Sequence, residues 1–93
     1  MRPDSVRVDN STADKYTILT IFAYDRMGLL YTITRTLFEL ELSVCRAKIG
    51  TRLDQVVDVF YVTDKSGRKI EDESRLATIR QRLLAAMEGM EQG

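Results

Sequence analysis

The sequence contains no histidine and a single cysteine, Cys45. The absence of histidine excludes every catalytic or metal site that depends on an imidazole within this chain. One cysteine allows neither an intramolecular disulfide nor a zinc site built from several thiolates, and it fits a reducing, intracellular setting. We therefore expect no catalytic residue, no metal site and no cofactor, and we do not expect the chain to be an enzyme by itself.

An excess of one charge is also missing, since 14 Lys and Arg side chains balance 14 Asp and Glu side chains. Nucleic-acid-binding domains commonly carry a strong basic field, so we expect no nucleic acid partner. Residues 1–5 lack the apolar stretch of a signal peptide, and no window approaches the roughly 20 apolar residues of a membrane span. These absences favour a cytoplasmic protein without membrane contact.

The length of 93 residues is that of one domain. We expect a single domain over 1–93, with its core at 6–88 and flexible ends at 1–5 and 89–93. A domain of this size buries only about 60–65% of the surface that its unfolded chain exposes, so it gains stability from a partner. Its size therefore favours pairing with another domain or a homo-oligomer.

Strand and helix patterns alternate along the chain. Runs rich in β-branched and aromatic residues predict strands, and apolar residues spaced by three and four predict amphipathic helices. Clusters of turn-forming residues at 10–14, 51–54 and 64–67 separate neighbouring elements. The predicted elements are, in order, strands at 6–9 and 15–23, a helix at 28–41, strands at 43–50 and 55–63, and a helix from about Asp72 to Met87.

This order predicts an α+β, ferredoxin-like sandwich, with an antiparallel four-stranded sheet and two helices on one face. Such folds commonly end on an edge strand, but the residues after Met87 offer none. The strand at 6–9 supplies it instead, because a hairpin partner of strand 15–23 is antiparallel and adjacent to it. The predicted order is therefore ββαββα, with the edge strand first.

A turn from Asp25 to Leu30 joins the predicted strand 15–23 to the helix that follows. Asp25 is placed to cap this helix, and Gly28 lets the backbone approach another group closely. The unpaired amides of a helix start form a weak anion site. An aspartate cap before a glycine is also ordinary helix initiation, so the turn alone identifies no ligand.

The strands at 15–23 and 55–63 are apolar on both faces. With both helices on one face of the sheet, Val57, Val59 and Tyr61 or the residues opposite them lie on the open face, where apolar patches mark interfaces. Alternatively, Arg46 and Lys48 cover this surface with their aliphatic stems. We favour an interface. Strand 43–50 alternates, with Cys45, Ala47 and Ile49 on one face and Arg46 and Lys48 on the other. The predicted interface residues are Cys45, Ala47, Ile49, Val57, Val59 and Tyr61.

Residues 6–87 resemble the ACT domain family, and most closely the C-terminal ACT domain of bacterial PII-protein uridylyltransferase/uridylyl-removing enzymes. The resemblance rests on three segments, which cover most of the chain: VRVDNSTADKYTILTIFAYDRMGLLYTITRTLFEL at 6–40, AKI at 47–49 and VDVFYVTDKSGRKI at 57–70. It implies the ferredoxin-like fold and a regulatory domain that pairs with other ACT domains. For this branch it also implies control of a linked or associated uridylyltransferase.

The resemblance further implies a small effector, an amino acid such as glutamine, at the turn and facing strand 45–49 of a partner domain. The effector residues by position are Asp25, Arg26, Met27, Gly28, Leu29 and Leu30. Related domains often have proline where this chain has Met27, which makes the turn less preorganised here. The main alternative is a ligand-free dimerisation or protein-interaction module. RNA binding on the sheet is weaker, because strand 55–63 lacks the basic-glycine-aromatic pattern of such platforms.

Overall fold

The computed structural model describes residues 4–92. Its elements are β1 (Ser5–Asp9), β2 (Thr17–Tyr24), α1 (Leu29–Glu39), β3 (Ser43–Lys48), β4 (Thr51–Arg52), β5 (Gln55–Thr63), α2 (Glu73–Glu88) and the 3-10 helix η1 (Gly89–Gln92). The two helices and four longer strands confirm the predicted ββαββα order. The short strand β4 is an addition to it.

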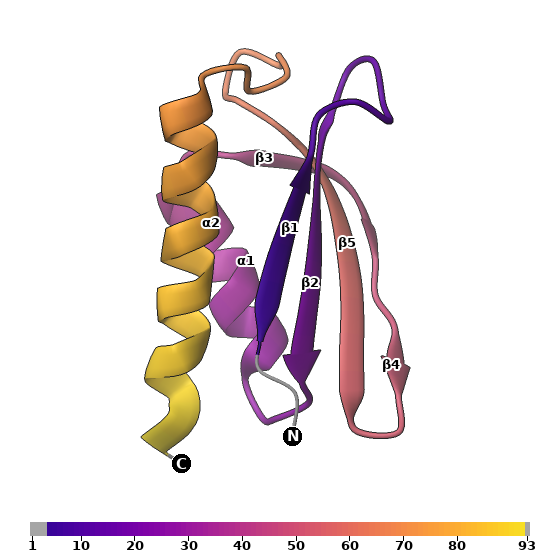
Figure 1. Cartoon of the computed structure of the whole chain (residues 1–93), viewed down its shortest axis with the longest axis vertical. Helices are drawn as coiled ribbons and strands as arrows, with labels where there is room; N and C mark the ends of the chain where they lie inside the picture. The colour runs from indigo at the N-terminus through magenta and orange to yellow at the C-terminus, as the bar shows by residue number, and fades with distance from the viewer. Residues whose placement is uncertain (1–3, 93) are drawn as a thin grey trace.

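The strands form one antiparallel sheet in the order β1-β2-β5-β3, and β4 also pairs with β5. Both helices lie on the same side of this sheet (Figure 1). β1 occupies the edge next to β2, as predicted for its hairpin partner. The chain therefore has the predicted α+β, ferredoxin-like architecture, with one face of the sheet covered by helices and the other open.

The core lies between the sheet and the helices. β2 and β5 contribute alternate side chains to it, so Leu19 and Ile21 face the helices while Thr20 and Phe22 between them do not. Each buried side chain of this kind stabilises the fold by about 1.5–3 kcal/mol relative to an exposed one. The largest fully buried apolar side chains are Leu19, Ile21, Ile33, Leu37, Phe60, Val62, Ile79, Leu83 and Met87.

Aspartate side chains form local hydrogen bonds in the predicted β1–β2 turn and at the start of α2, which was predicted to begin near Asp72. The Asp9 carboxylate accepts hydrogen bonds from the amides of Ser11 at 2.8 Å and Thr12 at 3.2 Å, which closes the β1–β2 hairpin. Asp72 caps α2 by accepting from the amide of Ser74 at 3.1 Å. Local side-chain chemistry is sufficient at both places, so the sequence alone identifies them.

Two segments differ from the predicted pattern. Residues 51–54, expected as a turn, contain β4, because Thr51 and Arg52 pair with Val56 and Gln55. After α2 the chain continues as η1, and Met90 in η1 packs against the core. The flexibility of 1–5 and 89–93 stays a prediction; residues 1–3 and 93 lie outside the described residues.

A bulge interrupts the pairing of β3 with β5. Val44 pairs with Val62, but Arg46 pairs with the next residue of β5, Tyr61, and Cys45 is the extra residue between them. A bulge of this kind shifts the alternation of side chains by one position. The strict alternation predicted for strand 43–50 is therefore broken at Cys45.

Candidate functional site

The turn between β2 and α1 begins the helix differently from the prediction. Gly28 is the N-cap residue, with a left-handed φ of 82°, and within the described chain no side chain caps the first turn of α1. Asp25 does not cap the helix; its amide instead donates to the carbonyl of Asp54 at 2.8 Å. The expectation for Asp25 was wrong because a capping side chain must stand at the N-cap position, which Gly28 occupies.

Arg26 lies inside the turn and does not face outwards. Its guanidinium donates to the Tyr24 carbonyl at 2.7 Å, to the Asp4 carboxylate at 2.9 Å and to the Met87 carbonyl at 2.9 Å. The last bond satisfies a carbonyl at the end of α2, where the helix dipole favours a cation. Arg26 therefore connects the turn to the residue before β1 and to the end of α2.

The remaining residues of the turn divide between core and surface. Leu29 is buried in the core, whereas Met27 is 97% exposed and Leu30 is 44% exposed. The Asp25 side chain is exposed as well. Of the six predicted effector residues, the structure thus brings Asp25, Met27 and Leu30 to one exposed turn, with Gly28 shaping its backbone.

Asp58 is a residue of this region that the sequence reasoning missed. It lies in β5 on the helix side of the sheet and is only 2% exposed, and its Oδ1 accepts from the amide of Gly50 at 3.1 Å. Burial raises the pKa of Asp58, and the nearby charge of Asp25 acts in the same direction. The sequence feature that could have identified Asp58 is its place inside the apolar run QVVDVFYVT, where an aspartate is unusual.

The structure decides which set of β5 side chains lies on the open face. Val56, Phe60 and Val62 are buried against the helices, whereas Val57 is 43% exposed on the opposite face. Val59 and Tyr61 share that face and are half-buried. The three predicted interface residues of β5 therefore do lie together on the open face of the sheet.

Cationic side chains partly cover the aromatic rings of the open face. Arg46 and Lys48 lie over the ring of Tyr61, each 5.9 Å from its centroid, and Arg7 lies over Phe22 at 5.8 Å. Contacts of this geometry combine shielding of the ring with a cation–π attraction. Arg46 and Lys48 therefore do cover part of the predicted interface, at Tyr61.

The three predicted interface residues around β3 do not share one face. Ala47 pairs with Phe60, whose side chain faces the helices, while the Cys45 sulfur lies 4.0 Å from the Thr63 hydroxyl oxygen. Ile49 follows the end of β3 and is 51% exposed. All three are exposed, because β3 forms the edge of the sheet.

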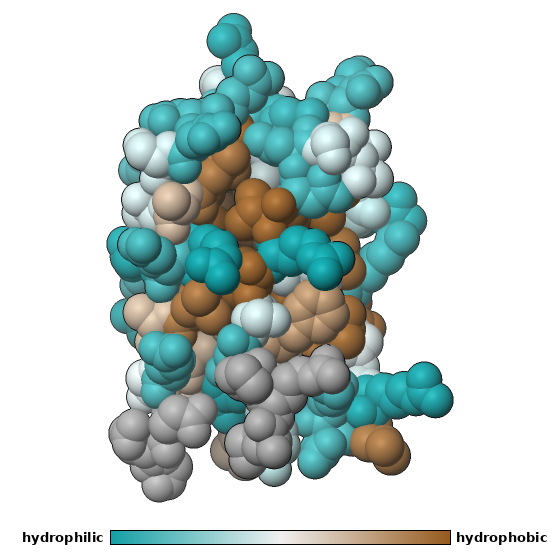
Figure 2. All heavy atoms as spheres, viewed as in Figure 1, coloured by the Kyte–Doolittle hydropathy of each residue, from teal (hydrophilic) through white to brown (hydrophobic). Residues whose placement is uncertain are grey.

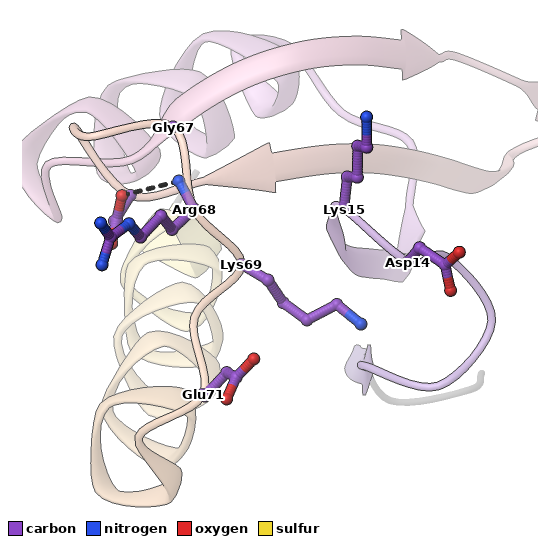
Figure 3. Close-up of a pocket in the computed structure, with 7 residues that line it drawn as sticks. Asp14, Lys15, Gly67, Arg68, Lys69 and Glu71 are labelled. Carbon is purple, nitrogen blue, oxygen red and sulfur yellow. Dashed lines mark hydrogen bonds between the residues drawn. The ribbon is translucent and has the colours of Figure 1, made fainter.

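Two hollows lie away from the turn. In the larger, about 540 Å³, the side chains of Lys15 and Arg68 point away from each other (Figure 3). The smaller hollow, about 250 Å³, is an apolar groove between β1 and α2. Figure 2 shows the face seen in Figure 1, on which hydrophilic side chains lie across a hydrophobic surface. The larger hollow is lined by Asp14, Lys15, Asp64, Gly67, Arg68, Lys69 and Glu71.

The charges of the larger hollow are engaged with the backbone. Asp64 accepts from the amide of Arg68 at 3.0 Å and from the hydroxyl and amide of Ser66 at 2.7 and 2.9 Å, and these bonds lower its pKa. Lys69 donates through Nζ to the Asn10 carbonyl at 2.8 Å. These contacts order two loops, and the remaining charges do not converge on a common point, so we place no ligand there.

Two further properties hold for the described part of the chain. Residues 4–92 contain no group of three or more Cys, Asp or Glu side chains placed to hold a metal ion. None of the helices in the same range has the length and apolar character needed to cross a membrane.

Comparison with known proteins places nearly all of the described region in one family. A family model described as "ACR9-like, ACT-like domain" matches residues 5–90. The chain is 44% identical over 85 residues to a bifunctional uridylyltransferase/uridylyl-removing enzyme of Azospirillum brasilense, covering 91% of this chain and 9% of that enzyme. It is 41% identical over 85 residues to the enzyme of the same name from Gluconobacter oxydans, again with 91% and 9% covered.

The Erythrobacter litoralis enzyme of the same name is 44% identical over 81 residues, or 87% of this chain. The chain therefore spans about a tenth of the length of the relatives it matches, 9% in each of these three. No solved structure matched the chain.

Proposed function

The chain belongs to the ACT-like domain family, and from this premise we propose that it is a regulatory domain whose turn from Asp25 to Leu30 senses a small amino acid such as glutamine. The proposal includes control of a linked or associated uridylyltransferase in the cytoplasm. It is supported by the similarity to one region of enzymes that carry that name.

One observation carries the effector site. α1 begins at Leu29 after the N-cap Gly28, and no side chain among the described residues caps it, so most amides of its first turn are open to an external acceptor. The amide of Leu29 is already bonded to the Arg26 carbonyl at 3.2 Å, and of the other amides at this helix start we assign those of Gly28 and Leu30 to the effector carboxylate. Asp25, exposed beside them, is the acceptor that we assign to its ammonium group.

Arg26 stabilises the turn although position 27 is methionine and not proline. Proline at that position would stiffen the turn by fixing its own φ, but here the Arg26 guanidinium holds the turn through its bond to the Tyr24 carbonyl at 2.7 Å. Met27 contributes a flexible apolar side chain that is 97% exposed. A preorganised turn is thus compatible with methionine, provided that Arg26 is present.

The turn alone gives little affinity. A carboxylate at a helix start contributes only about 0.3–1 kcal/mol, and the exposed turn excludes no water. A partner domain must therefore close the site, and the exposed edge strand β3 of that partner, with Cys45 to Ile49, is the surface we assign to it. Effector binding would then change domain pairing, which is how the signal would leave the domain.

Calorimetry and thermal denaturation with a panel of amino acids test the effector site. We expect glutamine or a related amino acid at millimolar concentration to raise the melting temperature, because a ligand that binds only the folded state stabilises it by mass action. Asp25→Asn is expected to abolish the shift, and Asp14→Asn, at an exposed position away from the turn, to preserve it. Unchanged melting temperatures with every amino acid would contradict sensing by this chain.

A test of the regulatory role requires an enzyme whose rate can be measured. A chimera of the Azospirillum brasilense enzyme, with its matching region replaced by this chain, allows uridylyl transfer to be measured with and without glutamine. We expect glutamine to change the rate in the chimera and not in its Asp25→Asn form.

A ligand-free interaction module is the second candidate, favoured by the exposed edge strand and open face. Sedimentation velocity separates the two functions: the module predicts association that amino acids leave unchanged. The exposed thiol of Cys45 offers a second readout, because pairing through β3 should slow its alkylation as protein concentration rises.

A further inference from the structure

The charged side chains on the open face of the sheet are almost all of one sign. Paired residues on neighbouring strands share a face, so the register assigns each strand residue to one side. The cations on the open face are Arg7 on β1, Arg46 and Lys48 on β3, and Arg52 on β4. The chain as a whole has no net charge, so these four cations set the open face apart from the rest of the molecule.

Asp9 is the one carboxylate that the described strands place on the open face. Its oxygens accept from the amides and hydroxyls of Ser11 and Thr12, and these bonds lower the pKa of Asp9 to about 2. Asp9 is thus committed to the β1–β2 turn and lies at the end of its strand. Its carboxylate stays ionised at neutral pH, so four cations and one anion leave a net charge of +3 on the strand residues of this face.

The cations flank an apolar centre. One row of paired residues crosses the sheet from Arg7 through Thr20 and Val59 to Lys48. The Cα atoms of Arg7 and Lys48 at its two ends lie three strand spacings apart, or about 14 Å, and their long side chains can turn from the neighbouring rings towards a ligand on this row. An extended peptide covers about 13 Å from residue i to residue i+4, and the side chains at i, i+2 and i+4 point the same way. The row therefore suits a peptide with acidic side chains at i and i+4, opposite Arg7 and Lys48, and an apolar side chain at i+2, opposite Val59.

We propose that the open face binds an extended segment of a partner protein that carries acidic side chains at i and i+4 and an apolar side chain at i+2. The inference rests on the proposal that Val57, Val59 and Tyr61 form an interface, and it adds the chemistry of the partner. The segment crosses the strands, pairs its carboxylates with Arg7 and Lys48, and covers Val59.

Two other occupants fit less well. A second copy placed face to face would oppose its four cations to four of the same sign, which is unfavourable. Single-stranded nucleic acid needs ring faces on which bases stack, but Arg7 occupies a face of Phe22, and Arg46 and Lys48 occupy that of Tyr61. The open face is therefore suited to acidic protein.

Titration of the 93-residue chain with short peptides, followed by amide NMR shifts, tests the proposal. The probe is a blocked peptide with the central sequence Glu-Thr-Leu-Thr-Glu, and its matched control, Thr-Glu-Leu-Glu-Thr, has the same composition with the acidic side chains turned away from the leucine. We expect the probe to shift open-face residues and to bind at least about fivefold more tightly than the control.

Two double variants separate the site from general charge effects. Arg7→Gln with Lys48→Gln is expected to weaken probe binding about fivefold or more, since two ion pairs are lost. Arg35→Gln with Arg82→Gln removes the same charge from two exposed helix positions and is expected to leave binding unchanged.

Equal affinity for both peptides, equal loss in both double variants, or no binding of the probe would overturn the proposal. Tighter binding of a twelve-nucleotide oligothymidylate would replace it with a nucleic acid partner. Self-association through open-face residues, seen as concentration-dependent shifts without peptide, would replace it with a second copy. The amino acid melting assay reports on the turn and not on this face, so the two proposals can fail separately.

Discussion

The guanidinium of Arg26 donates a hydrogen bond to the carbonyl oxygen of Met87, 61 positions away in the sequence, at 2.9 Å. The same group reaches the Asp4 carboxylate at 2.9 Å. One side chain in the proposed effector turn therefore joins the beginning of the described chain to the end of its last long helix. A change in the conformation of the turn would therefore alter contacts with Asp4 and with the end of α2.

Replacing Arg26 with glutamine is expected to lower the free energy of unfolding by about 2 kcal/mol, because hydrogen bonds that involve charged groups are worth about 1.5–3 kcal/mol each. Urea denaturation followed by circular dichroism measures the loss. Arg35→Gln is the matched control: its ion pair with Glu39 is exposed, and we expect a change below about 0.5 kcal/mol. Equal effects of the two substitutions would show that Arg26 does not stabilise the turn.

Gly28→Ala is expected to destabilise the fold by about 1–2 kcal/mol, the cost of a left-handed conformation for a residue with a Cβ. The cost is conformational, because φ at Gly28 is 82° and the nearest atom to an added Cβ, on Met90, lies 3.8 Å away. Gly89→Ala is the control, since φ at Gly89 is −66° and an added Cβ there meets nothing among the described atoms. Thermal unfolding should separate the two; a neutral Gly28→Ala would contradict the turn geometry.

Asp58→Asn is expected to stabilise the protein relative to wild type more strongly as pH rises above about 4. The pKa of Asp58 in the folded state is raised above its ordinary value of 3.8 by burial. The folded state therefore binds the proton more tightly than the unfolded state, and stability from this group is present at low pH and lost as pH rises through the folded pKa. Asparagine keeps an acceptor for the Gly50 amide without the charge.

Urea unfolding of both proteins between pH 4 and 8 checks this difference, and with no histidine in the chain few other side chains titrate there. A stability difference that stays constant over this range would be inconsistent with a raised pKa.

Asp9 is expected to titrate at a pKa of about 2, well below its ordinary 3.8, chiefly because the Thr12 hydroxyl donates to its carboxylate. Its stabilising effect is therefore present above about pH 4 and lost as pH falls towards 2. Carbon-detected NMR of the carboxyl group measures the value, and Thr12→Val should move it upwards. Ser66→Ala, which removes the corresponding bond to Asp64, should leave Asp9 unchanged; a shift at Asp9 there would point to a global effect.

The amino-acid sequence by itself determined the elements whose signals are local. Alternation and apolar spacing identified strands and helices, and the Asp72 cap and the Asp9 turn formed as their side-chain chemistry requires. The family resemblance also rests on the sequence. Local signals are reliable here because the interacting groups are two to four residues apart.

Tertiary structure decided the positions that depend on distant partners. The sequence pointed to Asp25 as a cap, but Gly28 starts the helix, and Arg26 is directed inwards because its acceptors on Asp4 and Met87 lie far away in the chain. The bulge at Cys45 follows from pairing with β5. No local pattern contains this information, since it arises when separate elements meet.

The charge of the open face is the clearest such case. The sequence as a whole is neutral, and its cations are spread along the chain. Pairing of β1, β3 and β4 within one sheet brings Arg7, Arg46, Lys48 and Arg52 to the same side, while most acidic residues fall in loops and on helices. The sequence determined that the central strands would have an apolar open face, and only the sheet register decided that cations would surround it.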